Sequence, residues 1–180
     1  MELPQLLRCL GLSDYIAFDF ETTGLSPEDD RIIEIAAIKF VDGNPVDRFV
    51  TLINPERPID PFITDITGIA DDMVRDKPIE SDIIDEFLEF LTDLPLVAHN
   101  ISFDKSFLDA LCVRFDKPKK NNPLIDTLQL SRTFLFFHPV HDLGSISEYF
   151  GLSSAGSHRA EKDTENCGII FQRLIKEAAS

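Results

Sequence analysis

Two acidic residues, Asp19 and Glu21, stand two positions apart in a segment whose pattern is that of a strand. Alternation places them on one face and places three large apolar residues on the opposite face, Ile16, Phe18 and Phe20. Residues two apart on a strand lie about 7 Å from each other, and two such carboxylates repel unless a cation lies between them. The following Thr22, Thr23 and Gly24 are small and suit close contact with a ligand. The pair therefore indicates a cation site, and the simpler alternative is a strand that ends at a solvated loop.

Further acids with the same chemistry occur later in the chain. Asp104 lies at the predicted start of a helix, and Asp163 lies in the first turns of the last predicted helix. Oxygen-only ligands select hard cations such as Mg²⁺ or Mn²⁺. Four carboxylates are more than one Mg²⁺ usually takes from a protein, and they suit two ions about 3.5–4 Å apart on either side of a scissile phosphate.

His158 stands five residues before Asp163, and its side chain can accept a proton near neutral pH. Five residues on a helix correspond to about 500° of rotation, so the two side chains would not share a helix face. The preceding loop contains Gly156, which lets His158 lie outside the helix and turn toward the acids. The alternative is an ordinary histidine of a surface loop.

The apolar pattern predicts the elements that must position these residues. Residues 1–13 are predicted as a short helix, followed by a three-strand meander over 15–21, 31–40 and 49–53 with a turn at 42–45. The proline-rich residues 54–80 are predicted as loop.

From residue 81 onward, helices alternate with short strands. A helix capped by Ser81 precedes a strand at 96–98, a second helix precedes a strand at 124–125, and three more helices follow. A meander followed by crossover helices predicts an α/β fold, with a mixed five-stranded sheet and helices on both faces.

Composition limits the class of protein. A chain of 180 residues suits a single domain, predicted over residues 1–180 with its core at about 14–177. The net charge of −15 means that metal ions or a partner must supply positive charge if the ligand is a nucleic acid. The three cysteines are far apart, which fits a reducing cytoplasm. The sequence shows no apolar run long enough for a membrane span and no basic-then-apolar signal pattern at its N-terminus.

Three segments together resemble the motifs of the DEDD superfamily of exonucleases, histidine branch. They are Asp19-x-Glu21-Thr-Thr-Gly, His-Asn-x-x-Phe-Asp104 and His158-x-x-x-x-Asp163, in this order. The chain looks most like the proofreading exonuclease subunit or domain of bacterial DNA polymerase III and is similar to helicase-fused exonucleases. This resemblance implies a ribonuclease H-like fold and two divalent metal ions, Mg²⁺ or Mn²⁺.

The resemblance also implies roles for individual residues. It assigns metal binding to four acids, Asp19, Glu21, Asp104 and Asp163. It makes His158 the general base. It assigns binding of the 3′-terminal nucleotide to a four-residue segment, Thr22, Thr23, Gly24 and Leu25.

Four further residues are expected to shape the substrate site. Gly68 and Ile69 resemble a small-plus-apolar pair that packs on terminal bases, although Thr67 stands where this family often has histidine. Asn100 and Phe103 are expected to surround Asp104. Nearby, His99 is expected to support the site through hydrogen bonds, and Arg159 is a candidate phosphate contact.

The predicted function is a metal-dependent 3′→5′ exonuclease that acts on single-stranded or frayed DNA 3′ ends in proofreading or repair. A DNA polymerase or helicase, as a subunit or as a fused domain, is the expected partner. A 3′→5′ exoribonuclease is the first alternative, because no residue can be assigned to a ribose 2′-OH. A non-catalytic docking module is the second alternative, which the presence of all four acids disfavours.

Overall fold

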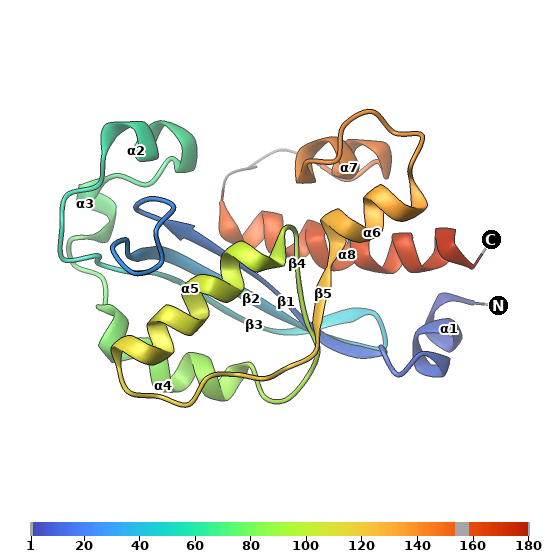
Figure 1. Cartoon of the computed structure of the whole chain (residues 1–180), viewed down its shortest axis with the longest axis horizontal. Coiled ribbons are helices and arrows are strands. Elements are labelled where there is room, and N and C mark those ends of the chain that lie inside the picture. Colours follow the sequence, from blue (N-terminus) through green and yellow to red (C-terminus); the bar gives the residue numbers. More distant parts are fainter. Residues whose placement is uncertain (1, 154–158, 180) are drawn as a thin grey trace.

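The computed structural model describes residues 2–153 and 159–179, and its elements surround one mixed sheet (Figure 1). The strands are β1 (Asp14–Thr22), β2 (Ile32–Val41), β3 (Asn44–Leu52), β4 (Leu96–Ala98) and β5 (Leu124–Asp126). Their order is β3-β2-β1-β4-β5. The first three strands are antiparallel, whereas β4 and β5 run parallel to β1. The predicted five-stranded mixed sheet is confirmed, with β3 at one edge.

Helices cover both faces of this sheet. They are α1 (Leu3–Cys9), α2 (Pro61–Thr67), α3 (Asp71–Val74), α4 (Glu80–Phe90), α5 (Ile101–Arg114), α6 (Thr127–Phe134), α7 (Leu143–Tyr149) and α8 (Ala160–Ala178). In one apolar core, α4 and α5 pack with Ile16, Phe18 and Phe20 of β1. In a second core, α1 and α8 pack with Tyr15 and Ala17. Across the described residues, no helix is both long and apolar enough to cross a membrane.

Strand β3 begins earlier than the sequence pattern predicts. The turn before it consists of Asp42 and Gly43, whose φ angles are 49° and 79°. Two positive φ angles characterise the two-residue hairpin turn that lets the partner strand resume at once. Asn44 therefore already pairs with Val41, and the predicted start at residue 49 is wrong. Pro45 is tolerated because an edge strand can lack an amide donor without leaving a neighbour unpaired.

Two short helices, α2 and α3, occupy part of the segment predicted as loop. The carboxylate of Asp60 accepts a hydrogen bond from the Phe62 amide at 2.8 Å, and Pro61 takes the first helical position of α2. Gly68 ends the helix with a φ of 71°. These are ordinary start and stop signals of a helix, so α2 could have been predicted from the sequence.

Helix α4 begins at Glu80 rather than after a Ser81 cap. The Asp82 carboxylate accepts a hydrogen bond from the Ile79 amide at 3.2 Å, which fixes the start of the helix. Glu80 is buried, and its Oε2 lies 2.5 Å from a guanidinium nitrogen of Arg114 in α5. This ion pair joins the two helices that cover the same face of the sheet.

Helix α8 lies close to β2 because small residues recur at four-residue spacing on its inner face. Ala160, Thr164 and Gly168 are all buried there. The Thr164 hydroxyl donates to the Ala36 carbonyl at 3.4 Å. A Cβ added to Gly168 would lie 2.5 Å from the Phe40 ring, so this interface has no room for a methyl group.

The variant Gly168→Ala is therefore expected to lower the free energy of unfolding by about 1–3 kcal/mol, the usual cost of overpacking a filled interface. Urea unfolding followed by circular dichroism measures it. The control is Arg173→Ala on the exposed side of the same helix, which should change stability by less than about 0.5 kcal/mol. Equal stabilities of the two variants would mean that the Phe40 ring can move aside without cost.

Candidate functional site

Strand β1 carries Asp19 and Glu21 near its end, on the face that α8 covers. Both residues are half-buried. The register of β1 against β2 shifts between Glu21 and Thr22. Such irregularities end strand pairing and re-aim side chains. The two acids thus lie on one face, as their spacing predicts, at the point where the chain leaves the sheet.

Asp104 reaches the same region from helix α5. It lies in the first turn of that helix and is 2% exposed. Its Oδ1 accepts a hydrogen bond from the Phe20 amide at 3.1 Å. Because Phe20 separates Asp19 from Glu21 in β1, the third carboxylate lies directly against the strand segment that carries the first two.

Asp163 comes from the first turns of α8, where it is half-buried. Its negative charge contributes to raising the pKa of both Asp19 and Glu21, which groups it with the other acids. The structure therefore brings the four predicted acids into one electrostatic cluster. His158, the predicted general base, lies outside the described residues, so its role stays a prediction.

Three carboxylates of this cluster resist ionisation, those of Asp19, Glu21 and Asp104. Burial, followed by repulsion from Asp104 and Glu21, raises the pKa of Asp19 well above its ordinary range. Burial, followed by the charge of Glu34, raises the pKa of Glu21 to about 8. Burial raises the pKa of Asp104 to about 7, although the hydrogen bond from the Phe20 amide opposes this change. Acids in such surroundings hold protons near neutral pH unless a cation compensates their charge.

The donor set fits a divalent cation in its chemistry. All four side chains offer carboxylate oxygens, which are the ligands that Mg²⁺ and Mn²⁺ prefer. Within residues 2–153 and 159–179, however, no three His, Cys, Asp or Glu side chains already form a group that could hold a metal ion. The hydrogen bond from the Phe20 amide engages only Oδ1 of Asp104, so this carboxylate keeps lone pairs with which it could bind an ion.

The loop after β1 is built around Asp30, which the sequence reading missed. Asp30 accepts a hydrogen bond from the Thr23 hydroxyl at 3.0 Å, and a Cβ at Gly24 would overlap its carboxylate. The buried Thr22 hydroxyl donates to the Gly24 carbonyl at 2.7 Å. Leu25 projects outward and is 84% exposed. The loop therefore offers Leu25 and backbone groups to a ligand, while both threonine hydroxyls stabilise the turn.

Gly68 and Ile69 are predicted to pack together on terminal bases, but the structure places them in different surroundings. Gly68 ends α2 and is exposed, whereas Ile69 is fully buried and packs with Ile33 in a small core cluster. A side chain buried in this way does not pack on a base, so this assignment of Ile69 is wrong. The exposed apolar side chains of the same segment are Phe62 and Ile66, 67% and 45% exposed.

Asn100 and Phe103 fix the start of the helix that carries Asp104. Asn100 precedes α5 in a left-handed conformation with φ 66°, and its amide donates to Asp126 at 3.0 Å. Phe103 is half-buried and packs on Phe107, with 5.0 Å between ring centroids. Both residues therefore shape the surroundings of Asp104, and whether they touch substrate stays a prediction.

His99 supports the end of β4 through two hydrogen bonds. Its Nδ1 lies 3.0 Å from the Thr127 hydroxyl, and its Nε2 lies 2.8 Å from the His141 carbonyl. Burial lowers the pKa of His99, which favours the neutral imidazole. The predicted hydrogen bonding of His99 is confirmed, and its support of the site stays a prediction.

A fifth acid, Glu34, escaped the sequence reading. It is 1% exposed, it pairs in register with Glu21 across β1 and β2, and its charge helps to raise the pKa of that neighbour. In the sequence, Glu34 stands out as a charged residue inside an apolar run. A buried charge of this kind requires a partner, and the local pattern does not reveal which residue it is. The partner is Arg159, whose guanidinium donates to Glu34 at 2.9 Å and is thus already engaged.

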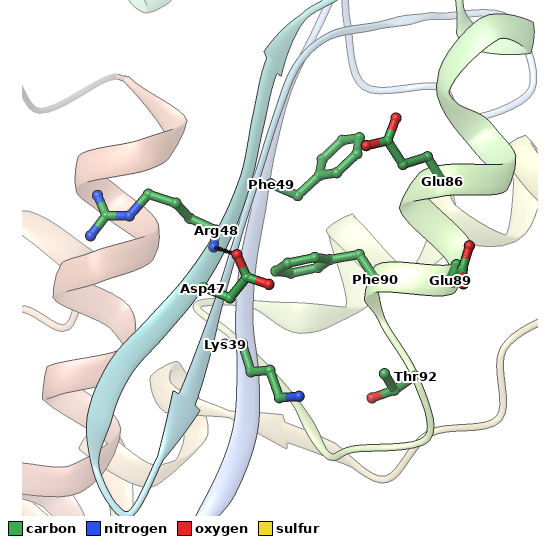
Figure 2. A pocket seen from close by; sticks show the side chains of 8 residues that line it. All are labelled: Lys39, Asp47, Arg48, Phe49, Glu86, Glu89, Phe90 and Thr92. Atoms are coloured by element: carbon green, nitrogen blue, oxygen red, sulfur yellow. Dashed lines mark hydrogen bonds between the residues drawn. The ribbon is translucent and has the colours of Figure 1, made fainter.

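A groove of about 360 Å³ lies elsewhere, between β3 and α4 (Figure 2). Phe49 and Phe90 line it with 5.9 Å between their ring centroids. Its other lining residues are polar or charged: Lys39, Asp47, Arg48, Glu86, Glu89 and Thr92. The groove is separate from the carboxylate cluster, because it is lined by none of the five acids Asp19, Glu21, Glu34, Asp104 and Asp163.

Comparison with known proteins finds one family whose sequence model, RNase_T, described as "Exonuclease", matches residues 16–171. The DNA polymerase III PolC-type of Latilactobacillus sakei is 42% identical over 172 residues, and that of Bacillus subtilis is 41% identical over 176 residues. Each alignment covers 96% of this chain but 12% of the polymerase, so the chain spans about an eighth of the length of these relatives.

Solved structures with the same fold are also exonucleases. Exonuclease X in complex with 5′ overhanging duplex DNA is 26% identical, with a TM-score of 0.72 and coverage of 92% of this chain and 93% of that protein. Escherichia coli Exonuclease I with a dA16 oligonucleotide has a TM-score of 0.79 at 19% identity, covering 91% of this chain and 42% of that protein. The exonuclease fold of this family depends on divalent metals.

Proposed function

This chain belongs to the exonuclease family that matches its residues 16–171, and from this premise we propose that it is a 3′→5′ DNA exonuclease. In this proposal, residues 14–177 form one domain that removes nucleotides from DNA 3′ ends by phosphodiester hydrolysis, in proofreading or repair. Its reaction would take place in the cytoplasm, where the three free cysteines would stay reduced.

The observation that carries the proposal is the hydrogen bond from the Phe20 amide to Asp104. It holds an acid from a helix against a strand that contributes two more. A phosphodiester is itself an anion, so a pocket of acids repels it unless cations lie between the two. Hydrolysis of a phosphodiester is therefore the chemistry that makes such a cluster useful.

We assign the four acids Asp19, Glu21, Asp104 and Asp163 to two divalent cations, Mg²⁺ or Mn²⁺. When bound, the ions would supply Lewis-acid stabilisation of the charge that develops on the scissile phosphate. The carboxylates hold and space this positive charge. The raised pKa values of Asp19, Glu21 and Asp104 mean that cation binding displaces protons, so affinity for Mg²⁺ should increase with pH.

The remaining assigned residues handle the proton and the DNA end. His158 would take a proton from the attacking water, which its imidazole can do near neutral pH. The backbone of Thr22, Thr23 and Gly24 would hold the terminal nucleotide, with Leu25 against its base. Gly68, Asn100 and Phe103 would border the same site.

The choice of DNA and of a partner rests on the relatives. The similar PolC-type proteins are DNA polymerases, and the Exonuclease X structure holds duplex DNA with a 5′ overhang. A chain with a net charge of −15 binds a phosphate backbone weakly by itself. A DNA polymerase or helicase, as a subunit or a fused domain, would hold the strand near the site and raise the number of cuts per encounter.

A polarity assay tests the proposal. A 5′-labelled single strand should give a ladder that shortens from the 3′ end with Mg²⁺ or Mn²⁺, and cleavage should stop in EDTA. Mismatched duplex ends should be cut faster than paired ends, because a frayed end reaches the loop at Leu25 without the cost of unpairing.

An RNA substrate and a Mn²⁺-binding measurement separate the alternatives. An RNA strand of the same sequence that is cut faster than DNA would support the exoribonuclease. Mn²⁺ binding without cleavage of either strand would support the docking module. A ladder that shortens from the 5′ end, or full activity in EDTA, would contradict the proposal.

A further inference from the structure

We propose that Glu34 is a positioning residue of the site, which with Arg159 fixes the start of α8 and thereby the place of Asp163. This inference rests on the proposed function, because it concerns the spacing of the acids that would hold the cations. Glu34 lies on β2 and does not belong to the three motifs that identify the site.

The Glu34 carboxylate makes three contacts at the start of α8, two with Arg159, which precedes the helix, and one with Ala160, its first residue. It accepts hydrogen bonds from the Ala160 amide at 3.0 Å, from Arg159 Nη2 at 2.9 Å and from Arg159 Nε at 3.4 Å. The side chain of Glu34 is 2% exposed, so this contact is shielded from water on the strand side. Bidentate guanidinium–carboxylate pairs have a fixed geometry as well as strength. The start of α8 is therefore held at one place on β2.

The position of this contact matters for the site because acids of the cluster lie on both sides of it. Glu34 is the cross-strand partner of Glu21, and Asp163 lies three residues after Ala160, in the first turns of α8. One carboxylate thus connects the strand-borne acids to the helix-borne acid. Thr164, one turn further on, donates to Ala36 and continues the same alignment of α8 along β2.

The charge of Glu34 opposes ionisation of Asp19 and Glu21, and the guanidinium of Arg159 acts in the opposite direction on Glu21. Glu34 adds a fifth carboxylate beside four that already repel, and it helps to raise the pKa of Glu21. Burial of an ion pair is often no more stable than apolar packing. The pairing of Glu34 with Arg159 and the Ala160 amide is therefore explained by the geometry that it imposes on the start of α8.

A second buried pair offers a matched control. Glu80 is 5% exposed, accepts a hydrogen bond from the Ile32 amide at 3.1 Å and pairs with Arg114 at 2.5 Å. Like Glu34, it joins a helix to β2 through one arginine and one backbone amide. Its helices, α4 and α5, lie on the other face of the sheet, and Glu80 does not appear among the charges that raise the pKa of Asp19 or Glu21.

The test is Mn²⁺ affinity without DNA, measured by calorimetry on Glu34→Gln, Arg159→Gln and Glu80→Gln. Loss of a residue that orients metal ligands typically costs about 10–100-fold in metal affinity or activity. Both Glu34→Gln and Arg159→Gln should lose affinity on this scale. Glu80→Gln should keep the wild-type affinity. Amide hydrogen exchange of residues 160–164 in the metal-free protein should accelerate in the first two variants alone.

The two substitutions at this pair change charge in opposite directions, which makes the outcome decisive. If Glu34 acted through its field alone, Glu34→Gln would weaken Mn²⁺ binding and Arg159→Gln would strengthen it. That result, or unchanged affinity in both variants, would overturn the inference. If Glu34→Gln fails to fold, Arg159→Gln still distinguishes the two mechanisms. A wild-type protein that binds Mn²⁺ but cuts no DNA would refute the proposed function and leave this comparison intact.

Discussion

Replacing Asp19 with asparagine is expected to lower the single-turnover rate by about 10³-fold or more and to stabilise the metal-free protein. Bound cations supply several kcal/mol of charge stabilisation, and about 1.4 kcal/mol corresponds to each factor of ten in rate. The stability gain has a separate cause, because burial and repulsion by four neighbouring acids penalise the ionised Asp19. A neutral amide avoids that penalty. Quenched-flow cleavage and thermal unfolding in EDTA measure the two effects.

The pH dependence of stability follows from the same cluster. The pKa of Glu21 is raised to about 8 and that of Asp104 to about 7, so the folded chain keeps protons that the unfolded chain releases near pH 4. The stability that these protons confer is fully present below about pH 4 and is lost as the pH rises to about 8. The melting temperature of the metal-free wild type should therefore fall over this range, and that of Asp19→Asn should fall less.

A matched control lies at the other end of the same strand. Asp14 begins β1, and its carboxylate is 3.5 Å from the Asp42 amide. The variant Asp14→Asn should therefore cleave DNA at the wild-type rate. If Asp19→Asn also cleaved at that rate, Asp19 would not hold a cation, and the assignment of the acids would fail. Loss of Mn²⁺ binding without loss of rate would contradict the metal mechanism itself.

The variant His158→Gln is expected to lose turnover by about 10²–10⁴-fold, the usual cost of removing a general base. Glutamine keeps a polar side chain of similar reach but cannot accept the proton at neutral pH. Mn²⁺ affinity and DNA affinity should stay close to those of the wild type, because the carboxylates remain. Single-turnover cleavage and calorimetric Mn²⁺ titration on the same sample separate these quantities.

His138→Gln provides the comparison for this variant. His138 is half-buried between α6 and α7, and its Nδ1 lies 2.6 Å from the Val140 carbonyl. Its replacement should leave the cleavage rate unchanged. Near-normal cleavage by His158→Gln would mean that another group accepts the proton. Loss of Mn²⁺ binding in His158→Gln would instead make this histidine a ligand or a determinant of the fold.

The parts of the site that follow from local pattern could be predicted from the sequence. Alternation in β1 places Asp19 and Glu21 on one face, because a strand repeats every two residues. Asp104 follows a short buried strand, and the start of the next helix is then constrained to the same end of the sheet. The mixed sheet follows in the same way, because a meander followed by crossover helices allows few other arrangements.

The parts that depend on distant contacts could not be predicted in this way. Glu34 stands in an apolar run, and its partner Arg159 is 125 positions away. Ile69 has the same local pattern whether it faces a base or the core, and its contact with Ile33 decides that it is buried. Asp30 organises the loop after β1 through side-chain contacts that its position in a polar segment does not reveal.

The position of β3 at the edge of the sheet has a consequence for concentrated solutions of this protein. An edge strand offers unpaired backbone groups to any other extended chain, which is a common start of fibrous aggregation. Here Pro45 removes one donor, and the exposed Asp47 and Arg48 add charges that a second β3 would have to bury. The register shift between Lys39 and Phe40 also distorts the neighbouring strand. Protection of this edge of the sheet therefore depends on a few residues of one hairpin, none of which belongs to the carboxylate cluster.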